Sequence, residues 1–245
     1  YVEPGQSAEA RLAPVAALNA RMIDRFTRQA PSWTYSNAAC RRLEGQWTIA
    51  GQTFDSKVPP ANFRLDNSPI LDELTIEGAI ELMDSRQLGR RGVTDMLGVS
   101  LSATDRIGHS YGTQGPEMCE QMLRLDTALG AFLDKLSTVP GGAIVVLTAD
   151  HGGSDFPERS AVEGYPHAGR VDRALQPRVN AALKARFGLD ADPVVSSAGG
   201  FVIVDKDRKS LPEPLRSQVL AAAIELLNAE PQVALAVARD ELLAE

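Results

Sequence analysis

One short stretch constrains the fold of this chain more than any other. It is an uninterrupted apolar run at residues 143–148, Ala-Ile-Val-Val-Leu-Thr, followed at once by Ala-Asp-His-Gly-Gly. Such a run is typical of a strand buried on both faces of a sheet. Before it, Gly115-Pro116 predicts the start of a long helix and Pro140 its end, and a β-prone run at 95–102 precedes that helix. Strand, helix and strand in this order predict a parallel, right-handed βαβ unit.

The rest of the chain also alternates between predicted helices and strands. Composition favours a helix over residues 8–28, and Ser68-Pro69 has the N-cap and first-turn residues that open another. We further expect helices over 171–187 and 212–228 and a strand over 200–205. The sequence therefore predicts an α/β fold, a mostly parallel sheet with helices on both faces.

Charge and apolar content exclude some classes of function. The 245 residues contain 25 Lys and Arg against 32 Asp and Glu, a net charge of −7. This balance argues against binding nucleic acid as a polymer, which requires a basic face, but not against a small anion, since bound metal ions reverse the local field. No apolar run approaches the roughly 18 residues of a membrane span.

Cys40 and Cys119 form either a disulfide or two buried thiols, and the sequence leaves both open.

Acidic and histidine residues follow both strands of the predicted βαβ unit. Asp105 and His109 share a short loop after the first strand, and Asp150 and His151 follow the second. Ligands of open α/β sheets bind beyond the carboxyl ends of strands, and neighbouring strands lie about 4.8 Å apart, so we expect the four side chains around one small volume. Carboxylate with neutral imidazole suits Zn²⁺. Asp-x-x-x-His alone is a weak signal and Asp-His-Gly after an apolar strand is a sharper one, and their coincidence on successive strands predicts a metal centre.

The third histidine, His167, lies in Tyr-Pro-His-Ala-Gly and is a possible further ligand because it follows the second pair closely. A loop histidine is the simpler interpretation, because residues 155–163 between them are rich in charge and predict a surface excursion. Tyr111 and Thr113 could line a substrate pocket, although residues at a helix entry often serve as caps. The residues that bind substrate therefore stay unknown.

Two motifs carry a resemblance to a known family. Thr-Ala-Asp-His-Gly at 148–152, with Ser-Ala-Thr-Asp-Arg-Ile-Gly-His-Ser-Tyr-Gly at 102–112, resembles the nucleotide pyrophosphatase/phosphodiesterase branch of the alkaline-phosphatase superfamily, closest to its bacterial threonine-nucleophile alkaline phosphatases. The likeness extends from the tryptophan-containing connector to Phe-Pro-Glu-Arg at 156–159. Beyond residue 159, only the order of the predicted helices and strands matches. The resemblance implies two Zn²⁺ ions, one on Asp105 and His109 and one on Asp150 and His151.

The family chemistry is hydrolysis of a small phosphate ester through a covalent phosphothreonine. The nucleophilic threonine and an upstream aspartate ligand have no counterpart in this sequence, and the family's further histidine ligand lies well downstream of His167. We therefore expect residues 1–245 to be the central segment of an incomplete alkaline-phosphatase-like domain, with no catalytic nucleophile of its own and with residues 29–66 as a connector or insertion. The resemblance also implies a periplasmic or secreted protein.

Several alternatives stay open at this point. A phosphomonoesterase is expected ahead of a phosphodiesterase. The rival enzymes are a sulfate- or phosphonate-ester hydrolase and a metal-dependent mutase of the same superfamily. A non-catalytic metal-binding or interaction domain is the rival from another class, and the upstream coding sequence would separate it from an enzyme. Oligomeric state is not readable from the sequence.

Overall fold

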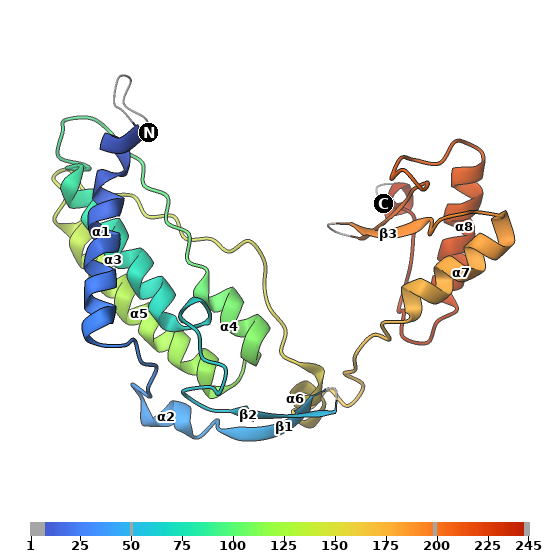
Figure 1. Cartoon of the computed structure of the whole chain (residues 1–245), viewed down its shortest axis with the longest axis horizontal. Helices are drawn as coiled ribbons and strands as arrows, with labels where there is room; N and C mark the ends of the chain where they lie inside the picture. Colours follow the sequence, from blue (N-terminus) through green and yellow to red (C-terminus); the bar gives the residue numbers. More distant parts are fainter. Residues whose placement is uncertain (1–7, 50, 198–199, 243–245) are drawn as a thin grey trace. The chain divides into compact units, whose positions relative to one another are not determined.

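The computed structural model describes residues 8–49, 51–197 and 200–242. These residues divide into two compact units, the first ending at Ala168 and the second beginning at Gly169. The first unit contains, in chain order, α1 (Ala8–Arg28), α2 (Ala38–Arg41), β1 (Gly45–Ile49), β2 (Gln52–Ser56), the 3-10 helix η1 (Leu65–Asn67), α3 (Pro69–Ser85), α4 (Ala103–Tyr111), α5 (Pro116–Ser137) and α6 (Pro157–Val162) (Figure 1). The second contains α7 (Leu175–Phe187), β3 (Val194–Ser197), β4 (Gly200–Ile203), α8 (Leu215–Asn228) and α9 (Arg239–Leu242).

The core of the first unit forms around α4, where this helix packs against α3 and α5 (Figure 1). Its buried members are Trp33, Val58, Ala103, Ile107, Tyr111 and Met118. The ring centroid of Trp33 lies 5.9 Å from that of Tyr111 and 6.2 Å from that of Phe63. Residues 29–66, predicted as a connector or insertion, contribute Trp33 and Val58 to this core and Phe63 to its edge.

Helix predictions from the sequence are largely confirmed. The predicted helix 8–28 is α1, Pro69 opens α3 and Pro116 opens α5. The C-terminal helices begin a few residues later than expected, α7 at Leu175 and α8 at Leu215. The predicted strand 200–205 is β4, which is shorter and ends at Ile203.

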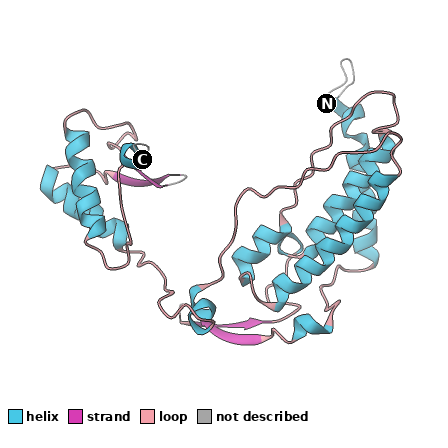
Figure 2. Ribbon diagram, turned by 180° about the vertical axis from the view of Figure 1, so that it is seen from behind, coloured by secondary structure: helices cyan, strands magenta, loops and turns pink. Residues whose placement is uncertain are grey.

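The predicted parallel sheet is not confirmed. The sheets of the described residues are two antiparallel pairs, β1 with β2 and β3 with β4. Residues 142–149 and 94–102 contain no strand and run as plain chain (Figure 2). The apolar run is exposed instead of buried, with 96% of Ile144 and 79% of Leu147 accessible. A strand forms only where a neighbour satisfies its backbone N–H and C=O groups, and no described segment pairs with this run.

A disulfide joins Cys40 of α2 to Cys119 of α5, with their Cα atoms 5.6 Å apart, and so decides the question that the sequence left open. Glu120, the next residue of α5, is buried and accepts the backbone N–H groups of Ser36 and Asn37 at 2.9 and 3.1 Å. Together these contacts hold the start of the 29–66 segment against α5. No helix among the described residues is long and apolar enough to cross a membrane.

Asp72 links α3 to the start of α4 and to α5. Its Oδ1 accepts the N–H of Ala103 at 3.0 Å, and its Oδ2 accepts from Gln121 Nε2 at 2.9 Å. Burial raises the pKa of Asp72 above its usual 3.8, and the hydrogen bonds partly oppose the rise. A carboxyl whose pKa is raised by folding contributes most stability below its unfolded pKa. That contribution is lost as the pH rises through the folded pKa.

The stability of the Asp72→Asn variant relative to the wild type is therefore expected to increase as the pH rises. The reason is that asparagine keeps a carbonyl oxygen to accept the Ala103 N–H and has no charge to bury. The difference in melting temperature, variant minus wild type, should increase from about pH 4 to about pH 8 in full-length protein with chelator present throughout. A difference that stays constant or falls with pH would contradict the assigned pKa direction.

The second unit has its own small core. Its fully buried residues include Leu183 of α7 and Val219 of α8, packed with Val194 of β3. Asn180 connects helix and strand, since its side chain accepts the Val194 N–H at 2.8 Å and donates to the Val194 carbonyl at 2.9 Å. The unit thus places α7 and α8 against a short hairpin.

Candidate metal centre

The first predicted ligand pair lies on a helix and not in a loop, which corrects the expectation from the sequence. Ala103, Ile107 and Tyr111 recur every four residues and bury one face of α4 in the aromatic core, which is what makes this stretch helical. Asp105 and His109 are likewise one turn apart on α4, and His109 Nε2 lies 3.3 Å from Asp105 Oδ1. Both side chains are exposed.

The second predicted pair lies in the plain chain between α5 and α6. The backbone N–H of His151 donates to Asp150 Oδ1 at 3.1 Å, and His151 Nδ1 lies 2.8 Å from the carbonyl oxygen of Gly152. An Nδ1–H donated to that carbonyl leaves Nε2 with a lone pair for a ligand. The carbonyl of Gly152, and then the carboxylates of Asp150 and Asp105, raise the pKa of His151 above 6.5.

Asp105 connects the two pairs. Its Oδ1 lies 3.3 Å from His109 Nε2 and 3.6 Å from His151 Nε2, and the latter atom lies 3.5 Å from Asp150 Oδ2. The structure therefore brings the four predicted ligands together, although they come from segments about 40 residues apart and no sheet places them. Two carboxylates and two imidazoles at one exposed position are the donor types of a divalent metal site.

The arrangement is not a closed coordination shell. Within the described residues, no three His, Cys, Asp or Glu side chains converge so as to hold a metal ion. The donor chemistry fits a metal ion and the coordination is incomplete, so the ligand assignment stays a prediction.

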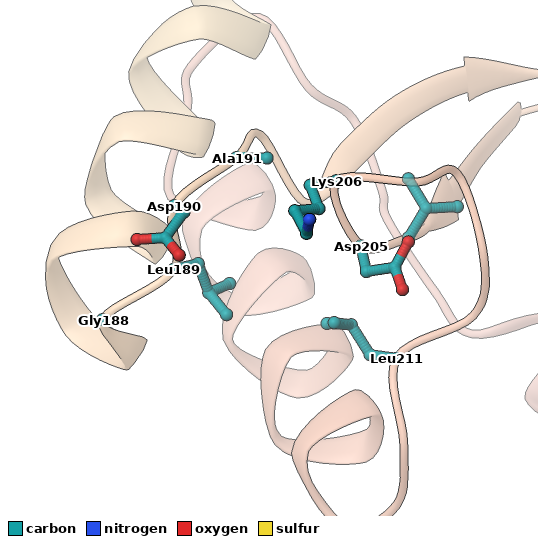
Figure 3. Close-up of a pocket in the computed structure, with 8 residues that line it drawn as sticks. Gly188, Leu189, Asp190, Ala191, Asp205, Lys206 and Leu211 are labelled. Carbon is teal, nitrogen blue, oxygen red and sulfur yellow. The ribbon is translucent and has the colours of Figure 1, made fainter.

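His167 does not join this group. It lies in an exposed turn after α6 and, within the described part of the chain, makes no ion pair or hydrogen bond with any of the four residues. A separate pocket of about 170 Å³ occurs in the second unit and includes none of the predicted ligands (Figure 3). It is lined by Gly188, Leu189, Asp190, Ala191, Val204, Asp205, Lys206 and Leu211.

Two charged residues near the second pair are buried, which the sequence did not lead us to expect. Residues 155–163 were expected at the surface, yet the side chains of Asp155 and Arg159 are only 0% and 3% exposed and form an ion pair at 3.0 Å. Phe156-Pro157 opens α6 between them, so the two lie one helical turn apart. The signal was available in the i, i+4 spacing of opposite charges at a proline-initiated helix.

Comparisons with known proteins identify the family of this chain. Residues 14–214 match the family model described as type I phosphodiesterase/nucleotide pyrophosphatase. The chain is 42% identical over 180 residues to alkaline phosphatase PhoK of a Sphingomonas species and 40% identical over 180 residues to alkaline phosphatase PhoD of Zymomonas mobilis. These alignments cover 72% and 71% of this chain and 32% and 31% of the relatives, so the chain spans about a third of their length.

The structural comparison shows where this fold occurs. A crystal structure of wild-type alkaline phosphatase PafA matches 95% of this chain and 47% of that protein, with a TM-score of 0.73 at 21% identity. The sequence of alkaline phosphatase PafA from Elizabethkingia meningoseptica is 30% identical over 182 residues, which are 71% of this chain and 32% of that protein. The described fold is therefore that of part of an alkaline phosphatase.

Proposed function

Because the chain belongs to the type I phosphodiesterase/nucleotide pyrophosphatase family, we propose that it is part of a metal-dependent hydrolase of phosphate esters. Its relatives PhoK, PhoD and PafA are alkaline phosphatases, which supports a monoesterase ahead of a diesterase. The observation that carries the proposal is the meeting of the two Asp-His pairs, with Asp105 Oδ1 between the two imidazoles.

In this proposal, the two pairs hold two zinc ions. Asp105 and His109 bind one ion from the exposed face of α4, and Asp150 and His151 bind the other. Bound Zn²⁺ supplies positive charge that lowers the pKa of a hydroxyl nucleophile and neutralises phosphoryl oxygens. The Gly152 carbonyl orients the His151 ring so that Nε2 faces Asp105 and Asp150. The helix fixes Asp105 and His109 to each other, so this pair needs little reorganisation on binding.

The nucleophile of this proposed reaction is a threonine outside the 245 residues, which would form the covalent phosphothreonine. The substrate is a small phosphate ester and not a nucleic-acid polymer, in keeping with the net charge of −7. The Cys40–Cys119 disulfide supports an oxidising compartment, and we propose a periplasmic or secreted protein.

The test is hydrolysis by the full-length protein of an aryl phosphate, a bis-aryl phosphate and an aryl sulfate, before and after chelation. We expect the monoester to be hydrolysed fastest, with activity lost on chelation and restored by Zn²⁺. Preferred turnover of the sulfate would support the rival ester hydrolase. Absence of turnover for all three would favour a non-catalytic metal-binding domain.

A further inference from the structure

Asp155 connects the chain segments that follow the two predicted ligand pairs. It lies four residues after His151, and its Oδ1 accepts the backbone N–H of Thr113, four residues after His109, at 2.8 Å. The Asp155 side chain is completely buried, so water does not compete for this hydrogen bond. One carboxylate thus joins the end of α4 to the segment that carries Asp150 and His151.

Arg159 holds that carboxylate in place. Its Nη1 donates to Oδ1 and Oδ2 of Asp155 at 3.2 and 3.0 Å, and its Nη2 donates to Ser56 Oγ at 3.2 Å. The guanidinium carbon lies 4.2 Å from the ring centroid of Phe156 and 5.1 Å from that of Trp47. Arg159 is therefore buried with both its charge and its flat faces occupied, which fixes its position.

Glu117 completes the connection at the first turn of α5. Ser56 Oγ donates to Glu117 Oε2 at 2.7 Å, and the Lys57 N–H donates to Oε1 at 2.9 Å. Glu117 is fully buried, and removal of water raises the pKa of its carboxyl, while Ser56, Lys57 and Arg159 oppose the rise. A buried charge of this kind is kept where several partners satisfy it together.

Two glycines provide the space for these contacts. A Cβ on Gly112 would lie 2.2 Å from Asp155 Oδ1. A Cβ on Gly115 would lie 2.6 Å from both Ser56 Oγ and Glu117 Oε2. None of these three side chains could stay where it is with an alanine at the adjacent glycine position. The chain therefore approaches the buried network at both ends of the segment that links α4 to α5.

We propose that Asp155, Arg159, Ser56 and Glu117 are positioning residues that set the distance between the two ligand pairs. The inference rests on the proposed function, because it assigns the network a role in the metal centre. The second pair lies in neither a helix nor a strand, and Asp155 is the buried anchor that follows it. Without that anchor, Asp150 and His151 lose their fixed relation to Asp105 and His109 on α4.

The test is the zinc affinity of full-length variants, measured by competition with a chromophoric chelator. Asp155→Ala is expected to weaken binding by about tenfold or more, the range for groups that orient metal ligands. Asp155→Asn should weaken it less, because its amide oxygen can still accept the Thr113 N–H. In both variants kcat should fall at saturating substrate with KM little changed, since misplaced ligands impair the transition state more than ground-state binding.

Gly115→Ala tests the network without removing any of its members. Gly115 has φ −84°, which alanine adopts readily, so the substitution adds only the intruding methyl group. We expect weaker zinc binding in this variant. Gly130→Ala is the matched control, because Gly130 lies within α5 and has open space around its Cβ position, and its zinc affinity should equal that of the wild type.

Glu120→Gln controls for a loss of stability alone. Glu120 lies one turn after Glu117 and is also buried. Its hydrogen-bond partners, Ser36 and Asn37, belong to a segment that contains none of the predicted metal ligands. We expect a lower melting temperature with unchanged zinc affinity. The inference is overturned if the wild type binds zinc and hydrolyses phosphate esters while Asp155→Ala retains its affinity within twofold. A wild type without zinc binding would instead overturn the proposed function and this inference together.

Discussion

Replacing His109 by alanine in the full-length protein is expected to lower kcat/KM for a phosphate monoester by about a thousandfold or more, roughly 4 kcal/mol of transition-state stabilisation. The reason is that His109 shares one exposed helical face with Asp105, and its Nε2 lies 3.3 Å from Asp105 Oδ1. Loss of this imidazole leaves one of the two proposed ions with a single ligand from this chain. Steady-state kinetics with one monoester and one diester provide the measurement.

His167→Ala is the matched control, because it removes the same kind of side chain from an exposed turn where, among the described residues, His167 makes no hydrogen bond or ion pair with the four predicted ligands. We expect a loss of less than about tenfold. A larger loss for His167→Ala than for His109→Ala would show that the ligand set is wrong and that His167 belongs in the metal site.

The second large effect concerns the 245 residues expressed alone, which are expected to hydrolyse an aryl phosphate no faster than a metal-only control. Within the described residues, no three of the predicted ligands converge so as to hold a metal ion, so each proposed ion has an incomplete ligand set in this segment. Val146, four residues before Asp150, is 84% exposed and has no strand partner among the described residues, so the second pair lacks the support of a sheet. Without full coordination and a nucleophile, neither positioning nor charge stabilisation is available.

The assay adds Zn²⁺ to the purified segment and compares the rate with that of the full-length protein under the same conditions. His151→Ala of the segment serves as the control for contaminating phosphatase. Robust turnover by the segment that His151→Ala abolishes would contradict this prediction and place the catalytic nucleophile within residues 1–245.

Helices were predictable here because their signals are local. Proline at the first position of α3 and α5 marks where each begins, and the apolar spacing within α4 decides its helical form. The sequence analysis did not predict α4, because it interpreted Asp105 and His109 as ligands in a loop. The helical signal is the buried stripe of Ala103, Ile107 and Tyr111.

Strands were less predictable because a strand depends on its neighbours. The 143–148 run has the composition of a buried strand, but its hydrogen bonds must come from another segment, and none pairs with it in the described chain. Asp105 Oδ1 still lies 3.6 Å from His151 Nε2, a proximity that requires only that the chain after α5 return to α4, and the assignment of these residues as metal ligands stays a prediction. Burial of the Asp155–Arg159 ion pair could not be predicted from the local sequence, because Arg159 is covered by Ser56 and Trp47, about 100 residues earlier in the chain.

Metal content of the purified full-length protein tests whether Asp105, His109, Asp150 and His151 hold two metal ions. Elemental analysis of the wild type should give two divalent ions per chain, and Asp150→Ala and His151→Ala should each give one. The reason is that each of these two substitutions removes a ligand from the second proposed ion and leaves Asp105 and His109 on α4 intact. Unchanged metal occupancy in both variants would contradict the assignment of these residues as ligands.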